Sequence, residues 1–272
     1  MKLNKLILLA GLTVVFTGQA SALTIVRNFG GGTASGNQAG GGDFQALFNA
    51  AADMWEAAIN DAHVVTLTYS WANLGSGTLG LHTMGTQGGS PHRETSGTIQ
   101  FANAASVGWF MDSTPTGNTE YTNFNETFQN LGGGSMQTGR VYTGATGNAS
   151  GRTDMLSVML HEIGHSLGLS SANTAFQAGN GDLDVDVTSP RPFAGASIQT
   201  VSGAHINLST SLMFPSIGTN LRRLISDADL VANAEISQFT SINLNAVPEP
   251  TTMVVAGLGL AALIRRNRKA KK

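Results

Sequence analysis

The sequence predicts an α+β fold that combines a mixed sheet with a few helices. Residues 43–59 carry apolar side chains at helical spacing, and residues 64–71 alternate strictly between apolar and polar. A third segment, residues 155–169, is apolar almost throughout but contains two histidines and a glutamate. These three patterns predict a helix, a strand with one buried face, and a buried helix that carries a functional site.

The N-terminal elements follow in order from these patterns. Residues 23–27 predict a short strand, and Asp43 is placed to cap the helix that follows a glycine-rich loop. A second strand is expected at Thr98–Ala102, and the polar, irregular residues 103–150 predict loops. The apolar helical face comprises Phe44, Leu47, Phe48, Ala51, Trp55, Ala58 and Ile59. The buried face of the strand at 64–71 comprises Val65, Leu67, Tyr69 and Trp71.

Residues 161–165 read His161-Glu162-Ile163-Gly164-His165. Side chains four residues apart on a helix project from one face, so both imidazoles can bind one metal ion. Neutral imidazole suits Zn²⁺, which leaves positions for a third ligand and a water. Glu162 is then placed to take a proton from that water as it attacks a carbonyl. Thr153 is the expected N-cap of this helix, and Gly168 its C-cap.

A structural alternative for the two histidines is a buried helix whose polar side chains are satisfied by hydrogen bonds alone. The surrounding residues argue against it, because they are apolar and would make an uncompensated glutamate costly to bury. The apolar neighbours are Met155, Leu156, Val158, Met159, Leu160, Ile163 and Leu167. The metal site is therefore the favoured interpretation.

The pattern His161-Glu162-x-x-His165-x-x-Gly168 resembles the metzincin clan of zinc endopeptidases, and Ser211-Leu212-Met213-Phe214-Pro215 resembles the clan's Met-turn. The clan's third histidine would fall at position 171, where this chain has Ser171. Leishmanolysin-like members take that histidine from shortly before the Met-turn, which implies His205 here. The resemblance also implies that Met213 underlies the metal and that a strand, here Thr98–Ala102, pairs with extended substrate.

The last expected element of the body is a C-terminal helix that begins at residue 227. Ser226 is placed as its N-cap and Asp229 as an acidic capping-box residue, and the helix should run to about Ser237. A helix after the Met-turn again resembles the metzincin order. The fold expected is thus a mixed sheet with an active-site helix, a Met-turn and a C-terminal helix.

Other groups compete for the third ligand position. Asp182, Asp184 and Asp186 alternate in a glycine-rich turn, where they could supply a zinc ligand, bind Ca²⁺ or simply remain solvated. Glu235 is a further carboxylate candidate. The three upstream histidines are expected to be ordinary surface or core residues: His63, His82 and His92.

The two ends of the chain predict sorting signals. Residues 1–22 carry lysines, an apolar segment and Ala20-Ser21-Ala22, which is typical of a cleaved secretory signal peptide. Residues 248–272 begin with Pro248-Glu249-Pro250 and continue with an apolar stretch at 251–264 and an arginine cluster. This tail resembles the PEP-CTERM sorting signal of Gram-negative bacteria. The resemblance implies recognition by an exosortase-type enzyme, export to the cell envelope or extracellular matrix, and transient membrane association through a short transmembrane helix.

Residues 23–247 form the expected metallopeptidase-like domain, and their composition excludes several functions. They hold seven arginines, no lysine and 16 acidic residues, a net charge of −9 that disfavours nucleic acid. The absence of lysine excludes Schiff-base chemistry. The chain has no cysteine, so it uses no disulfides and no cysteine-based zymogen switch. Its glycine runs lack the Lys-Ser/Thr of a phosphate-binding loop.

The leading functional hypothesis is a secreted zinc-dependent endopeptidase that acts on a protein or peptide. His161, His165 and His205 would hold Zn²⁺, and Glu162 would be the general base. A different class remains open, namely a catalytically weak matrix or surface protein with a metzincin-like fold. A hydrolase of non-peptide amides would share the same zinc chemistry.

Overall fold

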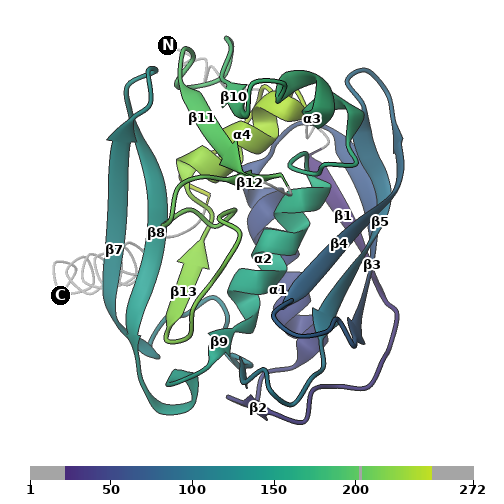
Figure 1. The fold of residues 1–272 in the computed structure, drawn as a ribbon, viewed down its shortest axis with the longest axis vertical. Helices are drawn as coiled ribbons and strands as arrows, with labels where there is room; N and C mark the ends of the chain where they lie inside the picture. Colours follow the sequence, from purple (N-terminus) through teal and green to yellow (C-terminus); the bar gives the residue numbers. More distant parts are fainter. Residues whose placement is uncertain (1–21, 202–203, 247–272) are drawn as a thin grey trace, which may run out of the picture.

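The computed structural model describes residues 22–201 and 204–246, which form four sheets with helices between and beside them (Figure 1). The N-terminal elements are β1 (Leu23–Phe29), β2 (Gln38–Ala39), α1 (Phe44–Ala58), β3 (His63–Ala72), β4 (Gly80–Gly88), β5 (Arg93–Ala102) and β6 (Trp109–Phe110). The middle elements are β7 (Tyr121–Asn130), β8 (Ser135–Ala145), a 3₁₀ turn (Gly147–Ala149), β9 (Thr153–Asp154), α2 (Met155–Ser166) and α3 (Thr174–Gly179). The C-terminal elements are β10 (Asp184–Asp186), β11 (Ser197–Val201), β12 (His205–Ile206), β13 (Leu221–Leu224) and α4 (Asp227–Ile236). Two of the sheets are small: β10-β11-β12 and β2-β6-β9.

The largest sheet has the strand order β1-β3-β5-β4. Strands β1, β3 and β5 are parallel, whereas β4 runs antiparallel to β5 at the edge beside α2. The sequence assigned the edge role to Thr98–Ala102, and this was wrong, because those residues lie in β5 and pair on both sides. The edge strand is Gly80–Gly88, whose glycines and polar residues gave no strand signal. The sheet is mixed, as predicted.

Helices α1 and α2 pack against each other and against the inner face of this sheet. Asp43 caps α1 by accepting a hydrogen bond from the Ala46 N–H, as its sequence position predicted. The buried face of α1 contains Phe44, Leu47, Phe48, Ala51 and Trp55, and the inner face of β3 contains Val65, Leu67, Tyr69 and Trp71. The predicted helix and strand therefore face each other across one core.

A second sheet, β13-β8-β7, flanks α2 on the side opposite the first sheet (Figure 1). Its β7–β8 hairpin falls within residues 103–150, for which the sequence predicted loops, and that prediction was wrong. Strand β7 is exposed along most of its length, so its sequence, Tyr-Thr-Asn-Phe-Asn-Glu-Thr-Phe-Gln-Asn, carries almost no apolar alternation. Helix α4 packs against β8 and completes this half of the molecule.

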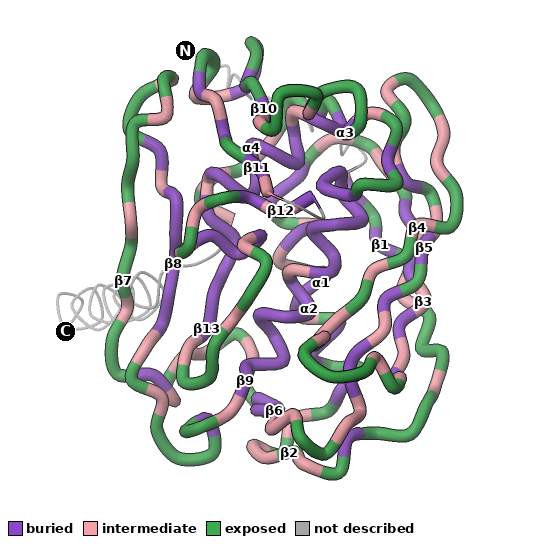
Figure 2. The backbone as a smooth tube through the Cα atoms, in the orientation of Figure 1, coloured by how far each residue is buried: buried purple, intermediate pink, exposed green. Residues whose placement is uncertain are grey.

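The buried apolar side chains form two groups. The larger spans the first sheet, α1, α2 and the second sheet, and the smaller includes residues of β10, β11, β12 and α4. Helix α2 forms a purple, buried column between the sheets (Figure 2). A buried ion network joins the base of α2 to the second sheet: the Arg222 guanidinium lies 2.8 Å from Asp154 and 2.6 Å from Asp112. Each of the seven arginines in the described residues is buried or half-buried. Four of these arginines are buried and three are half-buried, so most of the charge on the body's surface is acidic.

Candidate metal centre

Three histidines meet at the C-terminal half of α2. His161 and His165 project from one face of the helix, and His205 approaches from β12. The candidate ligand nitrogens of the three imidazoles all lie within 4.8 Å of one another. The ring centroids are 4.7 Å apart for His161 and His165, 5.1 Å for His161 and His205, and 4.9 Å for His165 and His205. The structure therefore brings together all three predicted ligands.

Main-chain carbonyls orient the two helical imidazoles. The Nδ1 atom of His161 lies 2.8 Å from the carbonyl oxygen of Leu212, and that of His165 bonds the carbonyl of Leu169. A carbonyl only accepts, so Nδ1 carries the proton in each ring and Nε2 keeps its lone pair. The two Nε2 atoms then face each other at 3.1 Å. Such an approach of two lone pairs is unfavourable unless a cation or proton lies between them.

Burial keeps these imidazoles neutral. Desolvation lowers the pKa of His161 to about 4, against the opposing effect of its hydrogen bond to Leu212. Desolvation likewise lowers the pKa of His165 well below its ordinary value, and the neighbouring histidines lower it further. Neutral imidazole is the form that coordinates metal ions, so burial keeps both side chains in the protonation state that metal binding requires.

Glu162 lies beside the three histidines and against the edge strand β4. Its side chain is 5 % exposed, and burial raises its pKa to about 8, while a hydrogen bond from the His82 main-chain N–H acts in the opposite direction. A Cβ atom on Gly80 would overlap the Glu162 carboxylate. Gly80 therefore lets the strand approach the carboxylate closely.

The predicted Met-turn closes the centre from the side of α4. A Cβ on Gly164 would overlap the Sδ atom of Met213, so the turn packs directly on α2. Asp229 of α4 is fully buried and accepts hydrogen bonds from Ser211 Oγ and from the N–H groups of Leu212 and Met213. It also accepts from Ser226 at the start of α4, completing the predicted capping box. One carboxylate thus begins a helix and holds the turn whose Leu212 carbonyl orients His161.

The ends of α2 differ slightly from the prediction. The N-cap is Asp154, whose side chain accepts from the Ser157 N–H, whereas Thr153 lies in β9. The sequence prediction of Thr153 was wrong by one residue because both types are good caps. At the other end Leu167 is the C-cap and Gly168 has a φ of 155°. The turn there brings the Leu169 carbonyl back to His165, and Ser171 lies exposed beyond it.

A cavity of about 310 Å³ opens beside His161 and His205. Its walls come from the segment that leads into β4, from α2, and from the chain after the Met-turn. The apolar lining residues are Leu79, Val158, Leu212, Phe214, Pro215 and Ile217. The candidate metal centre therefore adjoins a mostly apolar recess formed by both halves of the molecule.

The competing ligands lie apart from the three histidines. Asp182, Asp184 and Asp186 form a separate group whose carboxylate oxygens lie within 4.8 Å of one another. Asp184 accepts from Ser197 Oγ. Glu235 binds the Thr188 N–H and hydroxyl and lies 3.0 Å from Arg191, which gives it a structural role. For these three aspartates, a calcium site and a solvated turn both remain predictions.

Two of the three upstream histidines are not ordinary surface residues. His82 lies in β4, its ring stacks over His165 at 6.2 Å, and its Nε2 lies 2.9 Å from Glu94. His63 bonds the Glu94 carbonyl, while exposed His92 bonds Thr174. No local pattern marks His82, because β4 carries no strand signal and only its pairing with β5 places the residue beside α2.

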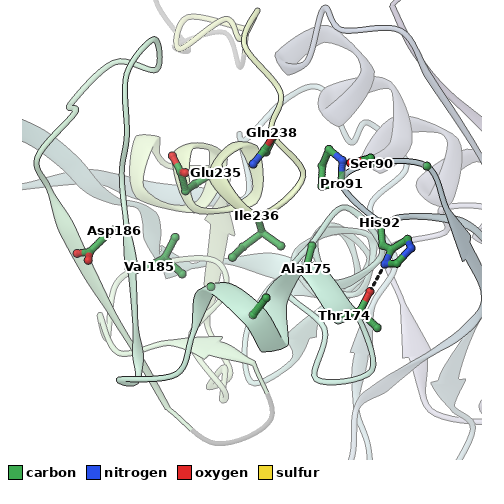
Figure 3. A pocket seen from close by; sticks show the side chains of 13 residues that line it. Ser90, Pro91, His92, Thr174, Ala175, Val185, Asp186, Glu235, Ile236 and Gln238 are labelled. Carbon is green, nitrogen blue, oxygen red and sulfur yellow. Dashed lines mark hydrogen bonds between the residues drawn. The ribbon is translucent and has the colours of Figure 1, made fainter.

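A larger cavity, of about 630 Å³, lies away from His161, His165 and His205, between the β4–β5 hairpin and helices α3 and α4 (Figure 3). His92 and Thr174 form its one drawn hydrogen bond, and Glu235 and Asp186 lie at the other side. Its polar groups are exposed or already bonded to neighbours. Size alone therefore does not make it the functional site.

Comparison with known proteins identifies one part of the chain. Residues 246–269 match the PEP-CTERM protein-sorting motif, close to the predicted tail at 248–272. The motif indicates export, sorting to the bacterial cell surface and recognition of the C-terminal tail by an exosortase. No curated protein and no solved structure matches this chain.

The tail at 248–272 and all of the signal peptide except Ala22 lie outside the described residues. The structure therefore bears on neither the signal peptide at 1–22 nor the apolar stretch at 251–264. Among residues 22–201 and 204–246, no helix is long and apolar enough to cross a membrane.

Proposed function

We propose that this protein is an exported zinc endopeptidase of metzincin-like construction, from a Gram-negative bacterium. The observation that carries the proposal is the convergence of His161, His165 and His205 beside buried Glu162. Three imidazoles with a carboxylate that is not a ligand are the donor set of a catalytic zinc site.

The donor set fits zinc on two further grounds. Two nitrogens bound at 2.0–2.1 Å to a tetrahedral ion are separated by about 3.3 Å, close to the 3.1 Å between the Nε2 atoms of His161 and His165. The Nδ1 protons of both rings go to main-chain carbonyls, the arrangement that fixes the ligand tautomer. When bound, zinc would supply a Lewis acid that polarises a carbonyl and makes water a usable nucleophile near neutral pH.

Glu162 would perform the proton transfers. Its carboxylate takes a proton from the attacking water and passes it to the nitrogen of the departing amine. Its apolar surroundings favour the protonated form needed for the second transfer, and the His82 N–H favours the ionised form needed for the first. Burial is the larger influence and raises the pKa of Glu162 to about 8, so the group can both accept and release a proton in the slightly alkaline range.

An extended peptide would bind along the open edge of β4. The Ala102 N–H of β5 donates to the carbonyl of Leu79. In an antiparallel ladder the main-chain groups of successive residues point alternately toward and away from the neighbouring strand, so those of Gly80 and Met84 face away from β5. Such an edge can add one strand, and the substrate's side chains then point alternately toward and away from α2. The recess lined by Leu79, Val158 and Ile217 would take an apolar side chain next to the cleaved bond.

The test compares metal content and casein cleavage in the parent, Glu162→Ala and His205→Ala proteins. We expect about one zinc per chain in the parent, retained zinc without cleavage in Glu162→Ala, and loss of both in His205→Ala. Full cleavage by Glu162→Ala would refute the assigned base. Unchanged zinc affinity in His205→Ala would refute the third ligand.

A matrix or surface protein with weak catalysis is the second candidate. It is favoured by the PEP-CTERM motif and by Ser171, which stands where the clan's usual third histidine would be. Stoichiometric zinc without cleavage of casein or of a mixed peptide library would favour this candidate over the endopeptidase.

A further inference from the structure

His82 connects the edge strand to both functional groups of the proposed centre. Its main-chain N–H donates to the Glu162 carboxylate, and its imidazole lies nearly parallel to that of His165, with an interplanar angle of 20°. The residue is not among the three clustered nitrogen ligands. It contacts the base through its backbone and a predicted ligand through its ring.

The imidazole of His82 is in turn held by a buried carboxylate. Its Nε2 lies 2.9 Å from Glu94 Oε1, and the two side chains are only 3 % and 1 % exposed. A Cβ on Gly97 of β5 would overlap the Glu94 carboxylate, so the glycine leaves room for the Glu94 side chain to reach His82. The Glu94 main chain is fixed as well, because its carbonyl oxygen lies 2.7 Å from His63 Nε2.

Strand β4 needs such an anchor because it has only one neighbouring strand. Its register with β5 is regular from Gly80 to Met84 and irregular between Met84 and Gln87. Beyond the irregularity, Gln87 accepts from the N–H and hydroxyl of Thr174 and ties the far end down. The His82–Glu94 pair is the anchor within the regular part, and breaking a buried pair from one side is costly.

We infer that His82 is a positioning residue, which, together with Glu94, holds the edge strand at the register where its N–H meets the Glu162 carboxylate. This role rests on the proposed function, since Glu162 is there the general base. The hydrogen bond fixes one carboxylate oxygen against the strand and leaves the other free to face the attacking water. Loosening β4 should therefore impair turnover while leaving metal binding intact, and it should also raise KM, because the proposed substrate pairs with the same strand.

The variants separate the hydrogen bond from the bulk of the ring. His82→Gln keeps a donor that can reach Glu94, whereas His82→Leu fills similar space and leaves Glu94 buried without a partner. His82→Asn is a milder alternative whose amide is too short to reach Glu94. Thr83→Val is the matched control, because residue 83 lies next along β4 on the opposite, exposed face.

Three readouts are measured on each protein: kcat and KM on a peptide substrate, zinc affinity by chelator competition, and deuterium uptake of the β4 segment without metal. For His82→Leu and His82→Asn we expect kcat to fall about tenfold or more, as for a misplaced catalytic group, with KM raised as well and zinc affinity within about threefold. Uptake in β4 should rise in both variants. His82→Gln should recover most of the kcat and the protection, and Thr83→Val should match the parent.

A parent-like kcat in His82→Leu would overturn the inference, as would equal losses in His82→Gln and His82→Leu. A loss of zinc affinity that parallels the loss of kcat would also overturn it, because the effect would then arise at the metal. If the parent itself shows no hydrolysis, the proposed function fails. The exchange data on the metal-free proteins would still decide whether the pair anchors β4.

Discussion

The Sδ atom of Met213 occupies the space where a side chain on Gly164 would begin. This relationship joins α2, between His161 and His165 in the sequence, to the predicted Met-turn. The helix tolerates a glycine at this position because close packing to the turn compensates for its poor helix propensity.

Gly164→Ala should force Met213 out of its position. Overpacking of this kind costs about 1–3 kcal/mol in the free energy of unfolding, and zinc affinity should fall with it. Urea denaturation and chelator competition measure the two effects. Gly179→Ala in α3 is the control, because a Cβ there makes only ordinary contact with Ile236. The cost should shrink in a Met213→Ala background; an equal cost in both backgrounds would show that the two residues do not compete for space.

Asp229→Asn should destabilise both α4 and the Met-turn. The carboxylate accepts five hydrogen bonds, from Ser211 Oγ, Leu212 N, Met213 N, Ser226 N and Ser226 Oγ. An amide would turn its NH₂ group toward some of these donors and leave them unsatisfied, at a cost of about 3 kcal/mol.

Urea denaturation and zinc titration of Asp229→Asn test this expectation. Asp227→Asn is the control on the same helical turn, because Asp227 accepts a single 3.3 Å bond from Gln137. Equal stability of the two variants would refute the special role of Asp229.

The metal-free protein should lose stability as the pH falls from 6.5 toward 4. Burial lowers the pKa of His161 to about 4 and that of His165 well below 6.5, so in this window the unfolded chain binds more protons than the folded protein. The free energy of unfolding therefore falls on acidification, by up to about 1.4 kcal/mol per pH unit for each histidine.

Glu162 acts in the opposite direction in the overlapping window. Burial raises its pKa to about 8, so the folded protein binds the extra proton and loses stability as the pH rises from 4.5 to 8. Urea denaturation in a chelator, in a Glu162→Gln background, isolates the histidines. Adding His161→Asn should flatten the remaining slope; an unchanged slope would exclude His161 as its source.

The recess beside His161 should select an apolar side chain next to the cleaved bond. Ile217→Ala enlarges it, so larger aromatic side chains should be accepted and kcat/KM for small aliphatic ones should drop by about 10-fold, as for a lost apolar contact. Cleavage sites in a peptide library, identified by mass spectrometry, measure the change. Val26→Ala, at an exposed side chain of β1, should leave the pattern unaltered. An identical pattern in Ile217→Ala would place the specificity elsewhere.

The sequence predicted those elements whose own side chains carry a strong local signal. Asp43, Ser226 and Asp229 cap helices as expected, and the alternating strand β3 has the predicted buried face. His161 and His165 share a helical face for the same local reason. His205 was predicted only through the resemblance to the metzincin clan, and the structure places it near both.

The parts that escaped prediction depend on tertiary pairing. Strand β4 is recognisable only because it pairs with β5. Strand β7 is exposed, so no apolar period marks it. His82 lies beside α2 through a contact with His165, 83 positions away in the sequence. Asp229 reaches the predicted Met-turn at Met213, 16 positions away. No local pattern encodes either contact.

The placement of the arginines has a consequence for the protein's persistence outside the cell. The body has no lysine, and none of its seven arginines is exposed. Trypsin-like enzymes, which cut after lysine or arginine in accessible, flexible chain, would find few such sites in the body until the fold opens locally. The same burial that anchors α2 to its second sheet therefore makes the folded body a poor substrate for a large class of extracellular proteases.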